Sequence, residues 1–153
     1  MTSGRLANAL AAIGEAVPPD AGDWWIIGST AMTLSGIETR EPDDVDVLGP
    51  ARMLLDLLRR WGVEPGEARS SDRFRSHPYA RASLPGCTPI ETMGDLHVRH
   101  GDAWLPVRPR TRIAVAMGRH TFHVPALAEQ IEILRLFGRP KDIEKARLIE
   151  ASL

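Results

Sequence analysis

The sequence predicts an α+β fold, in which helices pack on one mixed β-sheet and further helices end the chain. The apolar pattern indicates a helix, a strand, a helix, a strand and a helix, followed by several strands and then by helices. Of the 153 residues, 43% are hydrophobic and 25% are charged, which suits a globular protein with a core of its own. We therefore expect a single domain over residues 1–153.

Apolar spacing and turn residues define the first helix and the first strand. Leucine and isoleucine residues recur at helical spacing within residues 1–17, which predicts an amphipathic helix. A Pro-Pro pair ends this helix, because proline cannot donate a backbone hydrogen bond. Residues 24–27 are a short apolar run between turn residues, which is typical of a buried strand.

A short helix, a second strand and a longer helix follow. Ser29 can cap a helical segment over residues 30–34, and Gly36 can end it. Residues 44–48 alternate aspartate with valine, which predicts a strand with one apolar face. A Gly-Pro pair then opens a helix over residues 51–61. We expect the inner face of this helix to consist of Leu54, Leu55, Leu58 and Trp61.

The second half of the chain predicts short strands and then two helices. The segment around Phe74 and Tyr79 can form a strand or a loop over the site, and a hairpin turn is expected at Gly101-Asp102. The other strand patterns are residues 89–93, 96–98, 103–107, 112–116 and 121–124. A helix begins at residue 126, and its apolar face consists of Leu127, Ile131, Leu134 and Phe137. Glycine and proline break it before a last helix over residues 142–151.

Two carboxylates in the predicted strand 44–48 carry the first functional signal. Side chains alternate along a strand, so Asp44 and Asp46 point to one face while the valines point to the other. Two carboxylates about 7 Å apart repel each other, and a divalent metal with oxygen ligands relieves this repulsion. An exposed edge strand would also tolerate the pair, but the apolar flanking residues favour a buried strand with a metal.

The predicted strand 24–27 ends at Gly28 and Ser29, just before the short helix. Such a turn offers backbone N–H groups without helical partners, and these groups bind phosphate. The same two residues could form a turn and a helix cap without any ligand. Next to a metal-binding pair of carboxylates, they point to a nucleoside triphosphate.

These residues resemble the signature of the nucleotidyltransferase superfamily, which includes DNA polymerase beta and the minimal and abortive-infection-type nucleotidyltransferases. The signature is an apolar residue, glycine, glycine or serine, a short helix and loop, and then Asp-apolar-Asp or Glu. Ile27-Gly28-Ser29 and Asp44-Val45-Asp46 match it, with a spacer similar to that of the abortive-infection branch. The resemblance implies that Asp44 and Asp46 are metal-binding catalytic residues and that Gly28 and Ser29 bind nucleotide.

The segment LAEQIEILRLFGRPKD, residues 127–142, resembles the helical motif of the same branch, which has a basic residue and then Arg-x-Lys-Asp. Arg139, Lys141 and Asp142 match the motif, and Arg135 lies where a lysine is common. The resemblance implies that Arg135, Arg139 and Lys141 bind the triphosphate. A cationic helix junction on the surface is the alternative.

The superfamily usually has a third carboxylate on a later strand, and this chain offers two candidates. Glu91 lies among apolar residues in a strand-like segment, whereas Asp95 follows a glycine and is typical of a turn. We favour Glu91, which would complete the metal ligands and accept the proton of the acceptor. Asp95 stays open as the alternative.

The resemblance implies an enzyme that uses Mg²⁺ to transfer a nucleoside monophosphate from an NTP, such as ATP, to an acceptor hydroxyl. The acceptor can be RNA, a protein or a small molecule. A homodimer or a partner protein could supply part of the pocket. The alternative function is a non-catalytic module of the same fold, which binds a nucleotide or acts in a toxin–antitoxin-type pair.

Other features of the sequence disfavour other classes of protein. The formal net charge of −1 gives no overall basic field for nucleic acid, although a local basic patch can exist. The single cysteine, Cys87, and the lack of a long apolar run predict a cytoplasmic protein. Neither a P-loop nor a dinucleotide-binding motif is present. The two His-x-x-His pairs lie in strand-like segments, where residues three apart face opposite sides, so they do not predict a zinc site.

Overall fold

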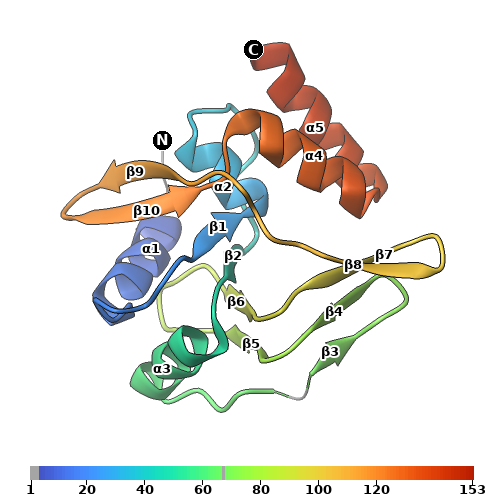
Figure 1. Cartoon of the computed structure of the whole chain (residues 1–153). Helices are drawn as coiled ribbons and strands as arrows, with labels where there is room; N and C mark the ends of the chain where they lie inside the picture. Colours follow the sequence, from blue (N-terminus) through green and yellow to red (C-terminus); the bar gives the residue numbers. More distant parts are fainter. Residues whose placement is uncertain (1–3, 67) are drawn as a thin grey trace.

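A four-stranded mixed sheet lies at the centre of the fold (Figure 1). The computed structural model describes residues 4–66 and 68–153. The central sheet has the strand order β1-β2-β6-β5, in which β2 and β6 are parallel and the other pairs are antiparallel. Its strands are β1 (Trp25–Ile27), β2 (Val45–Leu48), β5 (Tyr79–Ala82) and β6 (Ile90–Met93). The predicted α+β fold with a mixed sheet is therefore confirmed.

Two antiparallel sheets accompany the central one, where the sequence predicted a single sheet. One has the order β3-β4-β7-β8, and the other is the hairpin β9-β10. Their strands are β3 (Arg69–Ser70), β4 (Phe74–Ser76), β7 (His97–His100), β8 (Ala103–Pro106), β9 (Ile113–Met117) and β10 (His120–Val124). The chain leaves the central sheet in the turn after β6, where Asp95 has a φ of +44°. The strands that follow this turn therefore pair outside the central sheet.

Helices cover both faces of the central sheet. Those of the described chain are α1 (Gly4–Ala16), α2 (Gly28–Leu34), α3 (Ala51–Trp61), α4 (Leu127–Phe137) and α5 (Pro140–Ser152). One face packs against α1 and α3. The other face packs against the small sheet β3-β4-β7-β8 and the end of α4, which Figure 1 shows at the right. In the described part of the chain, every helix is too short or too polar to cross a membrane.

Alternation along the strands separates two buried faces of the central sheet. Ile26, Val47 and Ile90 face the layer formed by α1 and α3. Leu48 and Met93 face the small sheet, and they pack in one cluster with Ile27, Phe74, Leu96, Val98, Val107 and Phe137. The polar residues that alternate with Val47 and Ile90 must therefore lie on the side of the small sheet.

The inner face of α3 differs from the prediction at Leu55. The buried side chains of α3 are Met53, Leu54, Leu57 and Leu58. Leu55 is 38% exposed, because it lies roughly 130° around the helix from the centre of this buried stripe. The prediction of Leu55 as an inner residue was wrong, whereas the bounds of the helix were predicted correctly.

The short helix α2 begins at Gly28, one residue before Ser29. Ile27 is its N-cap residue and makes no side-chain hydrogen bond, so the predicted capping role of Ser29 is wrong. Ser29 lies inside the first turn instead. The helix ends at Leu34, and Gly36, the predicted stop, follows with a φ of +82° and donates its backbone N–H to the carbonyl of Thr33.

Candidate active site

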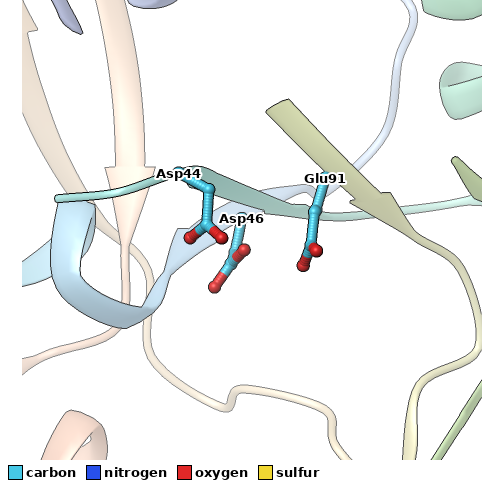
Figure 2. A group of neighbouring side chains, drawn as sticks. All are labelled: Asp44, Asp46 and Glu91. Atoms are coloured by element: carbon cyan, nitrogen blue, oxygen red, sulfur yellow. The ribbon is translucent and has the colours of Figure 1, made fainter. Parts of the chain in front are cut away.

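Three carboxylates meet on the face of the central sheet that lies toward the small sheet (Figure 2). Oxygen atoms of Asp44, Asp46 and Glu91 lie within 4.8 Å of one another. Asp46 is paired with Glu91 across the parallel strands β2 and β6, so the two side chains emerge side by side. Asp44 lies two residues before Asp46 and therefore points to the same face.

Asp95, the alternative third carboxylate, lies elsewhere. Its side chain is 65% exposed and lies 3.9 Å from Nδ1 of His97. It lines a different pocket, at the opposite end of β1 and β2. The structure thus brings Glu91, and not Asp95, to the pair Asp44 and Asp46.

Strand β5 supplies two partners of the acids that the sequence analysis missed. Nη1 of Arg81 lies 3.4 Å from Oδ2 of Asp44 and donates to Oε1 of Glu91 at 3.0 Å. The hydroxyl of Tyr79 donates to the same Oε1 at 3.0 Å. Arg81 is directly opposite Glu91 in the antiparallel pair β5-β6. The alternation of these two residues with alanines in the segment YARA was the signal available in the sequence.

Asp46 is the carboxylate with the least favourable surroundings. Its Oδ1 is buried and has no hydrogen-bond partner among the described residues. Burial raises the pKa of Asp46 well above its ordinary value of 3.8, and the charges of Asp44 and Glu91 raise it further. A buried carboxylate oxygen without a partner, beside two other carboxylates, is stabilised by a cation that binds all three.

The acids form one wall of a pocket of about 140 Å³, and basic residues form another. Arg139 and Lys141 lie at the start of α5, and Lys145 follows one turn later. Ser29 also lines the pocket, and Gly28 lies against Asp46. The remaining lining residues are apolar and consist of Ile27, Phe74, Met93, Leu96 and Phe137. The pocket therefore has separate places for a cation and for an anion.

Asp142 orients Arg139 at the edge of this pocket. Nε and Nη2 of Arg139 donate to the two carboxylate oxygens of Asp142, at 2.6 and 3.0 Å. Asp142 is 1% exposed and also accepts the backbone N–H of Arg139, which caps α5. The guanidinium lies 4.9 Å from the centre of the Phe74 ring, which lines the pocket. The hydrogen bonds to Asp142 and the contact with the Phe74 ring together hold the guanidinium of Arg139 in position.

Lys145 is a pocket residue that the sequence analysis missed. It is partly buried, and burial lowers its pKa from the ordinary 10.5. The charges of Lys141 and Arg139 lower the pKa further, whereas Asp142 and Asp46 oppose the shift. Lys141 and Lys145 are four residues apart on one helix, and this spacing was the available signal.

Arg135 does not lie in this pocket, contrary to its predicted place at the triphosphate. Its exposed side chain forms an ion pair with Glu150 of α5 and lines a separate open pocket. The buried neighbour Leu134 explains the difference, because successive helical side chains are about 100° apart. With Leu134 in the core, the side chain of Arg135 points away from the acids.

Comparisons with known proteins identify the fold. No family model and no curated protein matches the sequence. The solved structure of TM1012 from Thermotoga maritima, a proposed nucleotidyltransferase, matches with a TM-score of 0.78 and 19% identity, over 100% of this chain and 97% of that one. The antibiotic-resistance factor ANT(2″)-Ia matches in its solution structure with a TM-score of 0.60 and 15% identity, over 95% of this chain and 83% of that one.

A crystal structure of ANT(2″)-Ia in complex with adenylyl-2″-tobramycin also matches. Its TM-score is 0.59 and its identity 16%, over 95% of this chain and 88% of that one. At these identities the likeness concerns the fold. The chain therefore has the α+β fold of nucleotidyltransferases, as the resemblance of its motifs implied.

Proposed function

We propose that this protein is a nucleotidyltransferase, which moves a nucleoside monophosphate from an NTP to an acceptor hydroxyl. The observation that carries the proposal is the pocket in which three carboxylates face Arg139, Lys141 and Lys145. A metal–triphosphate complex has the complementary charges. The fold supports the proposal, since a structural neighbour was solved with the adenylylated compound adenylyl-2″-tobramycin.

The three carboxylates, which we call the acid wall, have donor atoms that suit a divalent cation, and we propose that this ion is Mg²⁺. Asp44, Asp46 and Glu91 offer oxygen ligands, which hard cations prefer. The buried, unpartnered Oδ1 of Asp46 independently favours a cation. When bound, the ion would neutralise charge that develops on the phosphates during transfer.

Residues at the start of two helices would hold the triphosphate. The first turn of α2 has backbone N–H groups at Gly28 and Ser29 without intrahelical partners, and Ser29 adds a hydroxyl. Arg139, Lys141 and Lys145 would balance the remaining phosphate charge by charge-assisted hydrogen bonds.

Glu91 would take the proton of the acceptor. In the reaction, the acceptor oxygen forms a bond to the α-phosphorus, the bond from this phosphorus to the β-phosphate oxygen breaks, and pyrophosphate leaves. The proton of the hydroxyl passes to a carboxylate oxygen of Glu91. The hydroxyl of Tyr79 donates to this carboxylate and holds it in position.

The test is incubation of the protein with each labelled NTP and Mg²⁺, with total RNA, with cell protein and with the protein alone. We expect label on an acceptor with the wild type, and none with Asp44→Asn or Asp46→Asn, which keep the side-chain shape. Asp43→Asn is the matched control, because Asp43 is 81% exposed and pairs with Arg40. Transfer at the wild-type rate by either site variant would contradict the mechanism.

The position of Glu91 favours the enzyme over a non-catalytic nucleotide-binding or toxin–antitoxin-type module, because a third carboxylate stands beside the pair. Specific binding of an NTP without any transfer would favour the module. The single-domain organisation, the cytoplasmic location and a homodimer or partner protein stay predictions from the sequence.

A further inference from the structure

Nine arginines of the described chain form an ion pair with a carboxylate, whereas three neighbouring arginines in and beside the small sheet do not. The paired arginines are Arg40, Arg52, Arg59, Arg81, Arg110, Arg112, Arg119, Arg135 and Arg139. Arg73, Arg75 and Arg99 are exposed, and within the described chain none of them has an ion pair. Arg73 and Arg99 donate to backbone carbonyls at 2.5 and 3.1 Å instead. Their charges are therefore available to a partner.

Strand register places two of these arginines on one face with an aromatic ring. Arg99 is directly opposite Trp104 across β7 and β8, and Arg75 is opposite His97 across β4 and β7. His97 and Arg99 are two residues apart, so all four side chains lie on the same face. The guanidinium of Arg75 lies 3.8 Å from the centre of the Trp104 ring. We call Arg73, Arg75, Arg99 and Trp104 the basic face.

The basic face reaches the back of the candidate active site. An open pocket of about 410 Å³ is lined by Arg73, Arg99, His100, Arg135 and one carboxylate, that of Asp72, among others. Arg73 donates to the carbonyl of Phe137, while Phe74, the next residue, lines the acid pocket together with Phe137. The side chain of Arg73 thus lines the open pocket of the basic face, whereas that of Phe74 lines the acid pocket, so this segment forms a wall between the two pockets. A long ligand on the basic face would have to extend around this wall for its end to reach the acid pocket.

We propose that the basic face binds the backbone of a single-stranded nucleic acid, whose terminal hydroxyl is the acceptor of the transfer. Arginine binds phosphate through paired N–H groups, and the half-buried indole of Trp104, which Arg75 covers on one side, offers its remaining surface to a base. Side chains two residues apart on a strand are about 7 Å apart, which suits successive phosphates of an extended strand. The acceptor role rests on the proposed transferase function, whereas the binding does not.

The test measures binding and transfer separately. Binding is followed by fluorescence anisotropy of a 5′-labelled RNA of about 12 nucleotides, in EDTA and without NTP, from about 50 to 200 mM KCl. For the double variant Arg75→Gln/Arg99→Gln we expect affinity at least about tenfold lower at low salt, and a salt slope smaller by about 1.4, which corresponds to two lost phosphate contacts. Arg60→Gln, which removes an exposed arginine of α3, should bind like the wild type.

A second variant separates stacking from charge. Trp104→Leu should lower the affinity by about fivefold or more without changing the salt slope, because stacking releases no counterions. Wild-type affinity in the double variant, or the absence of RNA binding by the wild type at low salt, would overturn the inference. Polyglutamate that competes as well as unlabelled RNA would also overturn it, because the face would then suit an acidic protein.

The acceptor role has its own readout. The double variant should lose transfer to RNA while its thermal shift with NTP and Mg²⁺ stays that of the wild type. Undiminished transfer to a small molecule or a protein, with RNA ignored, would refute the acceptor role and leave the transferase intact. If the wild type binds RNA but transfers a nucleotide to no acceptor at all, the proposed function is refuted instead.

Discussion

A Cβ atom on Gly28 would lie 2.8 Å from Oδ2 of Asp46. The backbone of Gly28 also has a φ of +71°, which side chains disfavour. The glycine that starts α2 therefore leaves space for a carboxylate of the acid wall. Any side chain at this position must displace the carboxylate of Asp46.

Gly28→Ala is therefore expected to damage the site more than the fold. The flexible Asp46 side chain can move aside, so we expect a loss of about 1–2 kcal/mol in the free energy of unfolding, mostly from the positive φ. The displaced carboxylate should abolish the Mg²⁺-dependent thermal shift. Gly62→Ala is the matched control, since Gly62 has a φ of +67° and no atom within 4 Å of the added Cβ. Equal Mg²⁺ responses in the two variants would contradict this role of Gly28.

The acid pair could be predicted because strand alternation is a local property. Asp44 and Asp46 share a face in any strand that contains both. Strand alternation alone could not predict the position of Glu91. This residue lies beside Asp46 because β2 pairs in parallel with β6, and the two strands are far apart in sequence. Its strand-like surroundings and the resemblance to a family supplied that step.

The remaining site residues depend on packing between distant elements. Arg81 reaches the acids through the pairing of β5 with β6, and Lys145 reaches their pocket because α5 packs against α2 and α4. Arg135 shows the reverse case, in which a motif suggested a role but the rotation of α4 around its buried Leu134 directs the side chain elsewhere. Sequence spacing cannot determine such rotations, because they follow from the whole core.

Lys145 is expected to contribute more to nucleotide affinity than other basic residues of α5. A charge-assisted hydrogen bond to phosphate contributes about 1.5–3 kcal/mol, so Lys145→Gln should raise the Kd of the NTP about tenfold or more. Arg147→Gln, at an exposed position of the same helix, should change it less than about twofold. Burial lowers the pKa of Lys145, so this lysine loses its charge at a lower pH than an ordinary lysine does. As the pH rises, the affinity of the wild type for NTP should therefore begin to decline at that lower pH. Calorimetric titrations at several pH values measure both effects, and equal losses in the two variants would contradict the assignment.

Glu129 is expected to stabilise the fold in a pH-dependent way. Its carboxylate is 6% exposed and accepts the backbone N–H groups of Arg110 and Thr111 at 2.7 and 2.8 Å. Burial alone would raise its pKa, but hydrogen bonds from Thr111 and Arg110 outweigh burial, so the pKa is lowered from 4.5. A carboxylate with a lowered pKa stabilises the folded state above the unfolded pKa, and this stability is lost as the pH falls through the lowered value.

Glu129→Gln should accordingly lower the free energy of unfolding by about 2 kcal/mol at pH 7. The difference from the wild type should shrink as the pH falls below 4.5. Glu132→Gln is the control, since Glu132 is 61% exposed and pairs with Arg110 at the surface, where a loss of at most about 1 kcal/mol is expected. Urea unfolding at several pH values measures these differences, and a constant difference across the range would refute the titration of Glu129.

Arg81 occupies the oxygens that a metal would bind, since it pairs with both Asp44 and Glu91. Arg81→Gln removes a positive charge beside these oxygens, so Mg²⁺ should bind about fivefold or more tightly. Without metal the same variant should be less stable than the wild type, because the three carboxylates lose their neutralising partner. Arg59→Gln, which breaks an exposed pair with Asp56, should change neither quantity by a comparable amount. Titration with Mg²⁺ and thermal unfolding in EDTA distinguish the two effects. Weaker Mg²⁺ binding by Arg81→Gln would instead mean that Arg81 holds the carboxylates in the geometry that the metal requires.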